Sequence, residues 1–348
     1  MPARAFILAA GFGTRLRPLT HHRPKPLVPV CGVTVLEQAL RLCAQHGIHS
    51  AVVNAHHLSG QIEAFCDAYR GMDIHVQVEL PEILGTGGGL QRARPRLDET
   101  FAVVNGDVLC DGDLGALLAA CERPGVEASM LLRRSDDAQV HGIVALDDQG
   151  RVARLTSLAH IPGVEPVAED THFTGIHALR RSALAPLSEG FACIVRSAYV
   201  ALIPQGRVVG LMHPGTWLDV GNPEVYLEAN RAVMDGAIDL PLDPWTRAAH
   251  GVRVVAGQPV AVGDATRCEI GAGAVLQAPC WIGHGAMVER GARLGPYTVV
   301  GAGARVGNGA RLRDTVVWDG RAVAAGASLD HCVVHDGGTL QLDGSARP

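Results

Sequence analysis

Residues 6–30 read FILAAGFGTRLRPLTHHRPKPLVPV, and this stretch decides the first part of the fold. Its apolar run, Phe6–Ala10, stops at a glycine, which is the pattern of a strand buried on both faces of a parallel sheet. Gly11 and Gly13 let the backbone turn sharply, so that successive N–H groups face an anion. Two prolines then hold Lys25 on a backbone with little freedom. The stretch therefore predicts a strand followed by a loop that grips phosphates.

Helical and strand-like patterns alternate beyond this loop. Repeated strand-helix units imply a mainly parallel sheet with helices on both faces, so we predict a Rossmann-like α/β domain. Ligands of such sheets bind at the carboxyl ends of the strands. The expected helices lie from Thr34 to a stop at Gly47 and near Ser59–Tyr69 and Gly88–Ala93, with strands at Ala51–Val53, Ile74–Val78 and Phe101–Val104.

The C-terminal part carries a strict six-residue repeat of aliphatic residues. A glycine directly follows five of these residues, and the period is typical of a left-handed parallel β-helix in which each short side of a coil points one aliphatic side chain inward. The repeat positions are Ile270, Leu276, Ile282, Val288, Leu294, Val300, Val306 and Leu312.

These patterns divide the chain into three parts. We expect a catalytic domain at 1–236, a linker at 237–251 and the β-helix at 252–340. The linker contains two prolines and no clear periodicity. A helix capped by Asn222 and running to about Met234 would end the first domain.

Composition limits the class of protein. The 348 residues contain 47% hydrophobic and 19% charged residues, with a net charge of -5 and no basic excess to indicate a nucleic-acid surface. Nine cysteines without a C-x-x-C pair indicate reduced, mostly buried thiols. The first apolar run is too short for a signal peptide or a membrane span, so we expect a cytoplasmic protein with small-molecule partners.

The motifs LAAGFGTRLRPLT and PKPLVPV together resemble the sugar-1-phosphate nucleotidyltransferases, and the resemblance covers most of the first 235 residues. It implies that Arg15 binds the leaving β- and γ-phosphates and that Lys25 bridges the α-phosphate and the incoming sugar phosphate. The nucleotide would lie against main-chain groups of the same stretch. The nucleotide-binding residues expected there are Leu8, Ala9, Ala10, Gly11, Gly13 and Thr14.

A second glycine-rich segment, EILGTGGGL at Glu82–Leu90, looks like the family's base-and-sugar loop. Its glycines leave backbone where no side chain blocks a flat ligand, although a glycine-rich hairpin or helix entry would show the same composition. The nucleotide-binding residues expected here are Glu82, Gly85, Thr86 and Gly87.

Two aspartates are candidates for a metal site. Asp107 follows an apolar strand at the carboxyl edge of the sheet, and Asp219 lies in GTWLDVGNPEVYLEAN, which resembles the family's second metal motif. Mg²⁺ prefers one or two carboxylates together with phosphate oxygens, so we expect Mg²⁺ as the cofactor.

The sugar site is less well defined by the sequence. HFTGIHAL at His172–Leu179 looks like the family's sugar-binding strand, which makes Thr174 and Gly175 candidate sugar contacts. Asn105, in the segment VVNGD, is the third candidate. Many members of the family carry a Glu-Lys-Pro motif whose lysine contacts the sugar phosphate. This chain has no lysine between Arg151 and Asp170. Arg154 and Arg196 are the candidates to hold the phosphate in its place.

The resemblance implies transfer of a nucleotidyl group from an NTP to a sugar 1-phosphate, with GTP and mannose 1-phosphate as first choice. The histidine pair His56 and His57 and the missing lysine are also similar to uridylyltransferases of N-acetylmuramate 1-phosphate and to heptose-phosphate enzymes. Two other classes stay open: a β-helix acyltransferase and a non-catalytic regulatory paralogue. For the β-helix we expect homo-oligomer assembly. The histidines available to an acyltransferase are His284, His331 and His335.

Overall fold

The computed structural model describes residues 4–134, 138, 142–167, 169–238 and 268–343. Contacts divide the chain into two compact units, one made of Met1–Phe12 and Ala39–Trp217 and the other of Gly13–Gln38 and Leu218–Pro348. The expected linker at 237–251 lies outside the described residues except for its first two positions, as does the start of the expected β-helix domain. The loop after the first strand thus belongs by its contacts to the same unit as the C-terminal coils.

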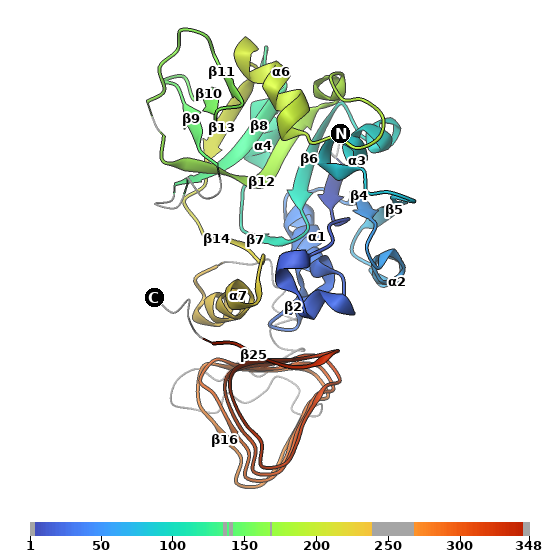
Figure 1. Cartoon of the computed structure of the whole chain (residues 1–348), viewed down its shortest axis with the longest axis vertical. Coiled ribbons are helices and arrows are strands. Elements are labelled where there is room, and N and C mark those ends of the chain that lie inside the picture. Colours follow the sequence, from blue (N-terminus) through green and yellow to red (C-terminus); the bar gives the residue numbers. More distant parts are fainter. Residues whose placement is uncertain (1–3, 135–137, 139–141, 168, 239–267, 344–348) are drawn as a thin grey trace. The chain divides into compact units, whose positions relative to one another are not determined.

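The first unit is built on a seven-stranded sheet with the order β13-β8-β12-β6-β1-β4-β5 (Figure 1). Its four strands β6, β1, β4 and β5 are parallel, whereas β12 runs antiparallel to both of its neighbours. The predicted mainly parallel α/β sheet is therefore confirmed. The strands are β1 (Ala5–Leu8), β4 (Ser50–Ala55), β5 (Asp73–Val78), β6 (Thr100–Asn105), β8 (Ala128–Arg134), β12 (Thr171–Arg180) and β13 (Val208–Met212).

Helices and short strands complete this unit. The expected helix near Ser59–Tyr69 is confirmed as α2, and the one near Gly88–Ala93 begins three residues earlier as α3. The elements are α2 (Ser59–Ala68), α3 (Gly85–Ala93), α4 (Leu114–Cys121), α6 (Val200–Leu202), the 3-10 turns η4 (Arg94–Arg96), η5 (Arg181–Leu184) and η7 (Ile203–Gln205), the π-helix η6 (Val195–Tyr199), and the strands β7 (Val108–Cys110), β9 (Val144–Leu146), β10 (Val152–Leu155) and β11 (Ala159–His160).

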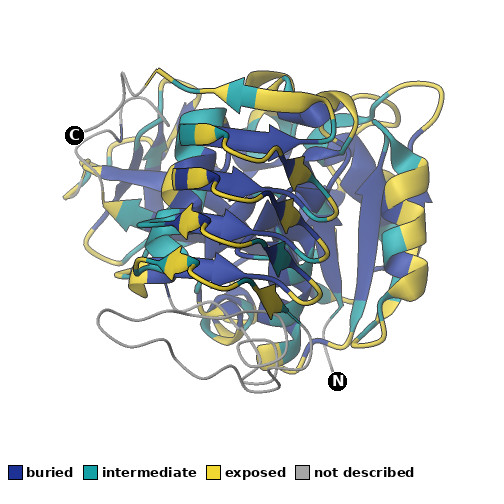
Figure 2. Ribbon diagram, turned by 90° about the horizontal axis from the view of Figure 1, so that it is seen from below, coloured by how far each residue is buried: buried dark blue, intermediate teal, exposed yellow. Residues whose placement is uncertain are grey.

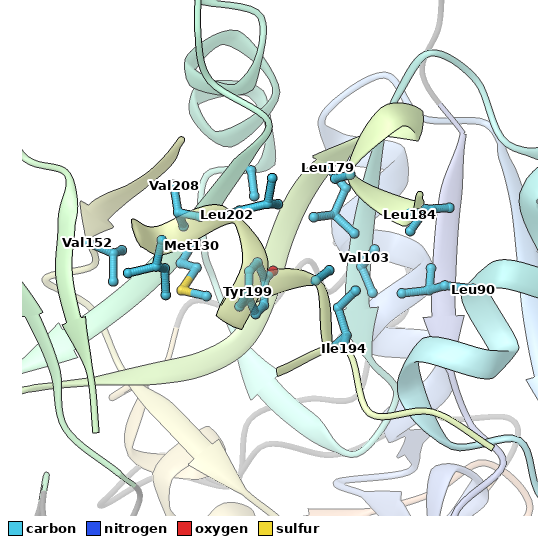
Figure 3. Close-up of a cluster of buried hydrophobic side chains, with 14 of the residues drawn as sticks. Leu90, Val103, Met130, Val152, Leu179, Leu184, Ile194, Tyr199, Leu202 and Val208 are labelled. Atoms are coloured by element: carbon cyan, nitrogen blue, oxygen red, sulfur yellow. The ribbon is translucent and has the colours of Figure 1, made fainter. Parts of the chain in front are cut away.

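An aliphatic core packs between this sheet and the covering segments (Figure 3). Val103 on β6, Met130 on β8 and Leu179 on β12 are fully buried, and Tyr199 contributes the largest side chain. Tyr199 keeps a polar partner, because its hydroxyl lies 2.5 Å from Nδ1 of the buried His177. Burial lowers the pKa of His177 to about 3, so this ring is neutral and supports the core.

The second unit begins with short turns and a helix. The expected helix capped by Asn222 is confirmed as α7, since the Asn222 side chain accepts a hydrogen bond from Val225 N. The expected helix from Thr34 is confirmed as α1, whose residues are shared between the units. The elements are η1 (Thr14–Leu16), η2 (Leu19–His21), η3 (Lys25–Leu27), β2 (Pro29–Val30), β3 (Val33–Thr34), α1 (Val35–Gln45), β14 (Trp217–Asp219) and α7 (Pro223–Asp235).

The C-terminal strands stack as parallel coils that Figure 1 shows end-on as a triangle. Glu269 pairs with Met287 and Met287 with Arg305, so these coils take eighteen residues, which equals three of the predicted six-residue repeats. The strands are β15 (Glu269–Ile270), β16 (Val275–Leu276), β17 (Cys280–Ile282), β18 (Met287–Val288), β19 (Arg293–Leu294), β20 (Thr298–Val300), β21 (Arg305–Val306), β22 (Arg311–Val317), β23 (Ala322–Val323), β24 (Ser328–His335) and β25 (Gly338–Gln341).

All eight repeat positions fall in strands, and the six from Ile282 to Leu312 are buried. Figure 2 shows many of the stacked strands buried and much of the turns between them exposed. Ile270 is 43% exposed because β15 is the outermost strand of its described sheet. A Cβ at Gly283 would lie 2.6 Å from the backbone nitrogen of Ala302 on the next coil, which explains a glycine after an inward residue. The predicted parallel β-helix is confirmed.

None of the nine cysteines, all of which lie in the described part, forms a disulfide, and seven are buried as expected. Within the described residues, no helix has both the length and the apolar character needed to cross a bilayer.

Candidate functional site

Three of the predicted site residues meet in the second unit. Lys25 Nζ lies 3.1 Å from Asp219 Oδ1, and the Arg15 guanidinium lies 3.2 Å from Asp219 Oδ2. The Lys25 side chain is 8% exposed, whereas the Arg15 side chain is 71% exposed. A nearly buried ammonium and a solvent-facing guanidinium therefore share one carboxylate.

Electrostatics keep Asp219 ionised. Burial by itself would raise the pKa of this carboxyl, but the charges and hydrogen bonds of Lys25 and Arg15 outweigh it and hold the pKa below the usual value. The group thus combines two fixed cations with an anionic oxygen donor, which suits the binding of a polyphosphate.

The loop that carries these cations is closed by local contacts. Thr20 Oγ1 donates to Gly13 O at 2.8 Å, and Gly13 has a φ of 62°. A Cβ at Gly13 would lie 3.1 Å from Lys25 Cβ, so only glycine lets the two strands of the loop approach this closely. Lys25 is the only lysine among the 30 Lys and Arg residues of the chain, a signal that the sequence offers directly.

The main chain after β1 is held by a buried polar network. Ala9 N donates to Asn54 Oδ1 at 2.7 Å, so the expected strand Phe6–Ala10 ends two residues early, at Leu8. Asn54 Nδ2 donates to Glu79 Oε1 at 2.7 Å, and Glu79 Oε2 accepts from Leu84 N at 2.8 Å. Neither buried polar side chain was predicted as part of the site, although each lies at or next to the end of a strand. Gly11 is exposed, and a Cβ there would meet nothing within 4 Å.

The glycine-rich segment after Glu82 is a helix and not an open loop. Gly87 N and Gly88 N both donate to Ala192 O, and a Cβ at Gly88 would lie 2.0 Å from Gly190 O. A Cβ at Gly85 would likewise lie 2.7 Å from Ala192 O. The chain itself fills the space where side chains would stand at these glycines, and the segment forms the helix entry that its composition also allowed. The nucleotide-binding role of Gly85, Thr86 and Gly87 stays a prediction.

The two polar side chains of this segment lie in different surroundings. Thr86 Oγ1 accepts a hydrogen bond of 3.0 Å from Ile194 N, whereas Glu82 is exposed.

The candidate sugar contacts lie together in the first unit. A Cβ at Gly175 would lie 2.3 Å from Asn105 Nδ2, so this glycine accommodates the Asn105 side chain at the end of β6. The hydroxyl of Thr174 is buried and donates to Leu131 O at 2.9 Å. The proton of this hydroxyl is therefore used inside the protein, whereas a contact of Thr174 with the sugar stays a prediction.

Two of the other candidates, His56 and Arg154, have structural partners. His56 Nδ1 lies 2.6 Å from Glu79 O, and its ring packs edge-on against Phe12, with the ring centroids 5.2 Å apart. Arg154, named as a substitute for the missing lysine, forms an ion pair with Glu169 at 2.9 Å. Arg196 lies exposed in the π-helix η6.

The histidines of the acyltransferase hypothesis include two with close neighbours. His331 is paired with Asp314 and Glu224 at 2.6 and 2.9 Å, and the buried His335 packs against the Trp318 ring. His284 lies exposed on the coils.

Potential metal ligands occur at two places. Asp107 lies half-buried just beyond β6, and Asp219 lies in the cation group described above. Among the described residues, one set of three ligand types converges, namely Cys110, Asp111 and His213. His213 Nε2 lies 3.0 Å from Asp111 Oδ1 and 3.3 Å from Thr216 O, and these contacts account for the orientation of its ring.

The comparisons with known proteins assign this α/β chain to a family. The model of the family described as nucleotidyl transferase matches residues 4–236. The chain therefore belongs to the nucleotidyl transferase family. Within it, the chain groups with the sugar-1-phosphate nucleotidyltransferases, because its curated relatives carry names of that kind.

One relative is a UTP–glucose-1-phosphate uridylyltransferase of Synechocystis, 30% identical over 77% of this chain and 76% of the relative. A mannose-1-phosphate guanylyltransferase of Mycobacterium tuberculosis is 31% identical over 68% of this chain and 66% of the relative. The crystal structure of HddC from Yersinia pseudotuberculosis matches 66% of this chain and 99% of its own, with a TM-score of 0.54 and 20% identity, a likeness of fold alone.

Proposed function

We propose that the chain transfers a nucleotidyl group from an NTP to a sugar 1-phosphate, giving an NDP-sugar and pyrophosphate, with GTP and mannose 1-phosphate as substrates. The observation that carries the proposal is the shared carboxylate of Asp219, bound by Lys25 and Arg15 at 3.1 and 3.2 Å. Two cations held this way are placed to receive the oxygens of a triphosphate as soon as it arrives.

The reaction forms one bond and breaks another at the α-phosphorus. An oxygen of the sugar phosphate attacks in line, and the bond to the β-phosphate oxygen breaks as pyrophosphate leaves. No proton has to be removed from the nucleophile, since a phosphate is already an anion. The nearly buried ammonium of Lys25 would hold the α-phosphate and the incoming phosphate together, and the exposed guanidinium of Arg15 would bind the departing phosphates.

We also propose Mg²⁺ as the cofactor, with Asp107 and Asp219 as its protein ligands. The donor chemistry fits, because Asp219 is ionised and partly exposed and Asp107 is half-buried beyond β6. Mg²⁺ prefers few carboxylates and completes its shell with water and phosphate oxygens. When bound, it would neutralise charge on the triphosphate. Chelation by EDTA should abolish turnover, and added Mg²⁺ should restore it.

The choice of nucleotide and sugar rests on relatives. The guanylyltransferase of Mycobacterium tuberculosis supports GTP and mannose 1-phosphate, while the uridylyltransferase of Synechocystis favours UTP and glucose 1-phosphate as the second candidate. A matrix of the four NTPs against mannose, glucose, N-acetylmuramate and heptose 1-phosphates, followed by pyrophosphate release, tests both. GTP with mannose 1-phosphate should give the highest kcat/KM. A higher value for another pair would overturn this choice of substrates, and no release from any pair would reject the function.

We further propose a cytoplasmic homo-oligomer that assembles through the β-helix. Support comes from nine cysteines without a disulfide, as a reducing compartment requires, and from the stiff coils with open edges. Light scattering of the purified protein tests the assembly, and a monomer at micromolar concentration would contradict it.

A further inference from the structure

Arg23 lies two residues before Lys25 and is held by the last coils of the β-helix. Its Nε and one terminal nitrogen lie 3.1 and 3.2 Å from the two oxygens of Asp336, and its guanidinium carbon lies 4.4 Å from the centroid of the Trp318 ring. The side chains of Arg23 and Asp336 are only 19% and 21% exposed. An arginine that forms a two-point ion pair and also stacks on an indole ring has both the position and the orientation of its guanidinium fixed.

The Trp318 ring is itself held in place by burial and a hydrogen bond. It is fully buried, and its Nε1 donates to the hydroxyl of Tyr226 on α7 at 2.9 Å. The Tyr226 hydroxyl donates in turn to Pro29 O at 2.6 Å. Pro29 belongs to the same loop as Lys25, so these hydrogen bonds connect Trp318 to that loop. The indole on which Arg23 stacks is therefore held by a buried hydrogen-bond network.

The far end of the same loop is also attached. Cys31 N donates to Asn230 Oδ1 at 2.9 Å, and Asn230 on α7 is 1% exposed. Residues 23–31 are thus held at both ends, and three prolines restrict the backbone between them. Lys25 therefore sits on a short, stiff segment whose position depends on α7 and the β-helix.

We propose that Arg23 is a positioning residue for the transfer reaction, which makes the terminal coils of the β-helix part of the catalytic framework. Arg23 touches neither substrate nor reacting atoms in this account, and it acts by fixing the loop that presents Lys25. The proposal rests on the proposed function for its kinetic consequences, whereas the anchoring of the loop stands on the contacts alone.

Kinetics of full-length variants test the positioning role. Arg23→Ala should lower kcat/KM for the NTP roughly tenfold or more, since small displacements of a catalytic group are costly. Asp336→Asn should act in the same direction, and the exchange Arg23→Asp with Asp336→Arg should recover part of the loss. In a Lys25→Ala background the Arg23→Ala change should cost nothing further, because its only route of action has been removed.

A matched control is available on the same coils. Arg313 pairs with Asp330 at 3.0 Å, and both side chains are about half exposed, so this ion pair is expected to contribute little. Arg313→Ala should therefore leave kcat/KM unchanged. Thermal unfolding of every variant identifies those that fold.

Hydrogen exchange separates the anchor from the reaction. The amides of residues 24–31 should exchange faster in Arg23→Ala than in the wild type, and should not change in Arg313→Ala. A folded Arg23→Ala variant with wild-type kcat/KM, an equal loss in the Lys25→Ala background, or unchanged exchange would each overturn the proposal. If the wild type turns over no pair of substrates while the exchange result holds, the proposed function fails and the anchor stands.

Discussion

Lys25 Nζ lies 3.1 Å from Asp219 Oδ1, although 194 residues separate the two along the chain. One residue follows the first strand and the other precedes α7, so only folding brings the ammonium to the carboxylate. This pair, with Arg15 on the second carboxylate oxygen, is the basis for most of the predictions below.

Replacing Lys25 by alanine should lower kcat about a hundredfold or more, because a fixed positive group aimed at the transition state is worth roughly 3 to 4 kcal/mol. Pyrophosphate release at saturating substrates measures the effect. Arg17→Ala is the matched control, since Arg17 lies in the same loop but the two ion pairs described for Asp219 are with Lys25 and Arg15. Near-wild-type turnover of Lys25→Ala would reject the role given to this side chain.

Lys25 should also be the only side-chain amine that reacts with pyridoxal 5′-phosphate and borohydride, since the chain has no other lysine. An anionic aldehyde suits a site that binds phosphates. NTP with Mg²⁺ should protect the residue, as mass spectrometry of peptides would reveal. Labelling at an undiminished rate in the presence of NTP would argue that the nucleotide does not cover Lys25.

Asp219→Asn should destabilise the protein at neutral pH and lose this effect in acid. The pKa of Asp219 lies below the usual 3.8 in the folded state, so its stabilising contribution is fully present above that value and disappears as the pH falls through the folded pKa. Urea unfolding of both proteins between pH 3 and pH 7 checks the sign. A difference that grows below about pH 4 would contradict it.

Thr174→Val should cost about 1 kcal/mol in the free energy of unfolding, the net value of a typical buried hydrogen bond. The KM for the sugar phosphate should stay the same, because the hydroxyl bonds to Leu131 O at 2.9 Å inside the protein. A large rise in KM with unchanged stability would instead support Thr174 as a direct sugar contact.

Gly88→Ala should destabilise the protein by about 1–3 kcal/mol, as overpacking of an interior does. The new methyl group would lie 2.0 Å from Gly190 O. Gly60→Ala is the control: Gly60 lies in α2 with nothing within 4 Å of its Cβ position, so alanine should be neutral or stabilising there. Equal stabilities of the two variants would show that Gly88 is not packed as described.

Patterns of short range were predictable from the sequence. The apolar run at Phe6 and the aliphatic residue at every sixth position from Ile270 define strands by local periodicity, and the structure has strands at both. The cap at Asn222 uses a side chain and an amide three residues apart. Each of these features is decided by neighbours in the chain, which is why a linear pattern reveals it.

Only the tertiary structure decided which polar groups belong to the candidate site and which stabilise the fold. The sequence supplied Arg15, Lys25 and Asp219 as chemistry, and folding joined them. The tertiary structure also packs Gly88 against Gly190 and bonds the Thr174 hydroxyl to Leu131 O, two contacts that the sequence does not reveal. No sequence motif marks Asn54, Glu79 or Arg23, because their hydrogen-bond and ion-pair partners lie far away along the chain. Such pairing depends on distance in space, which a linear pattern does not contain.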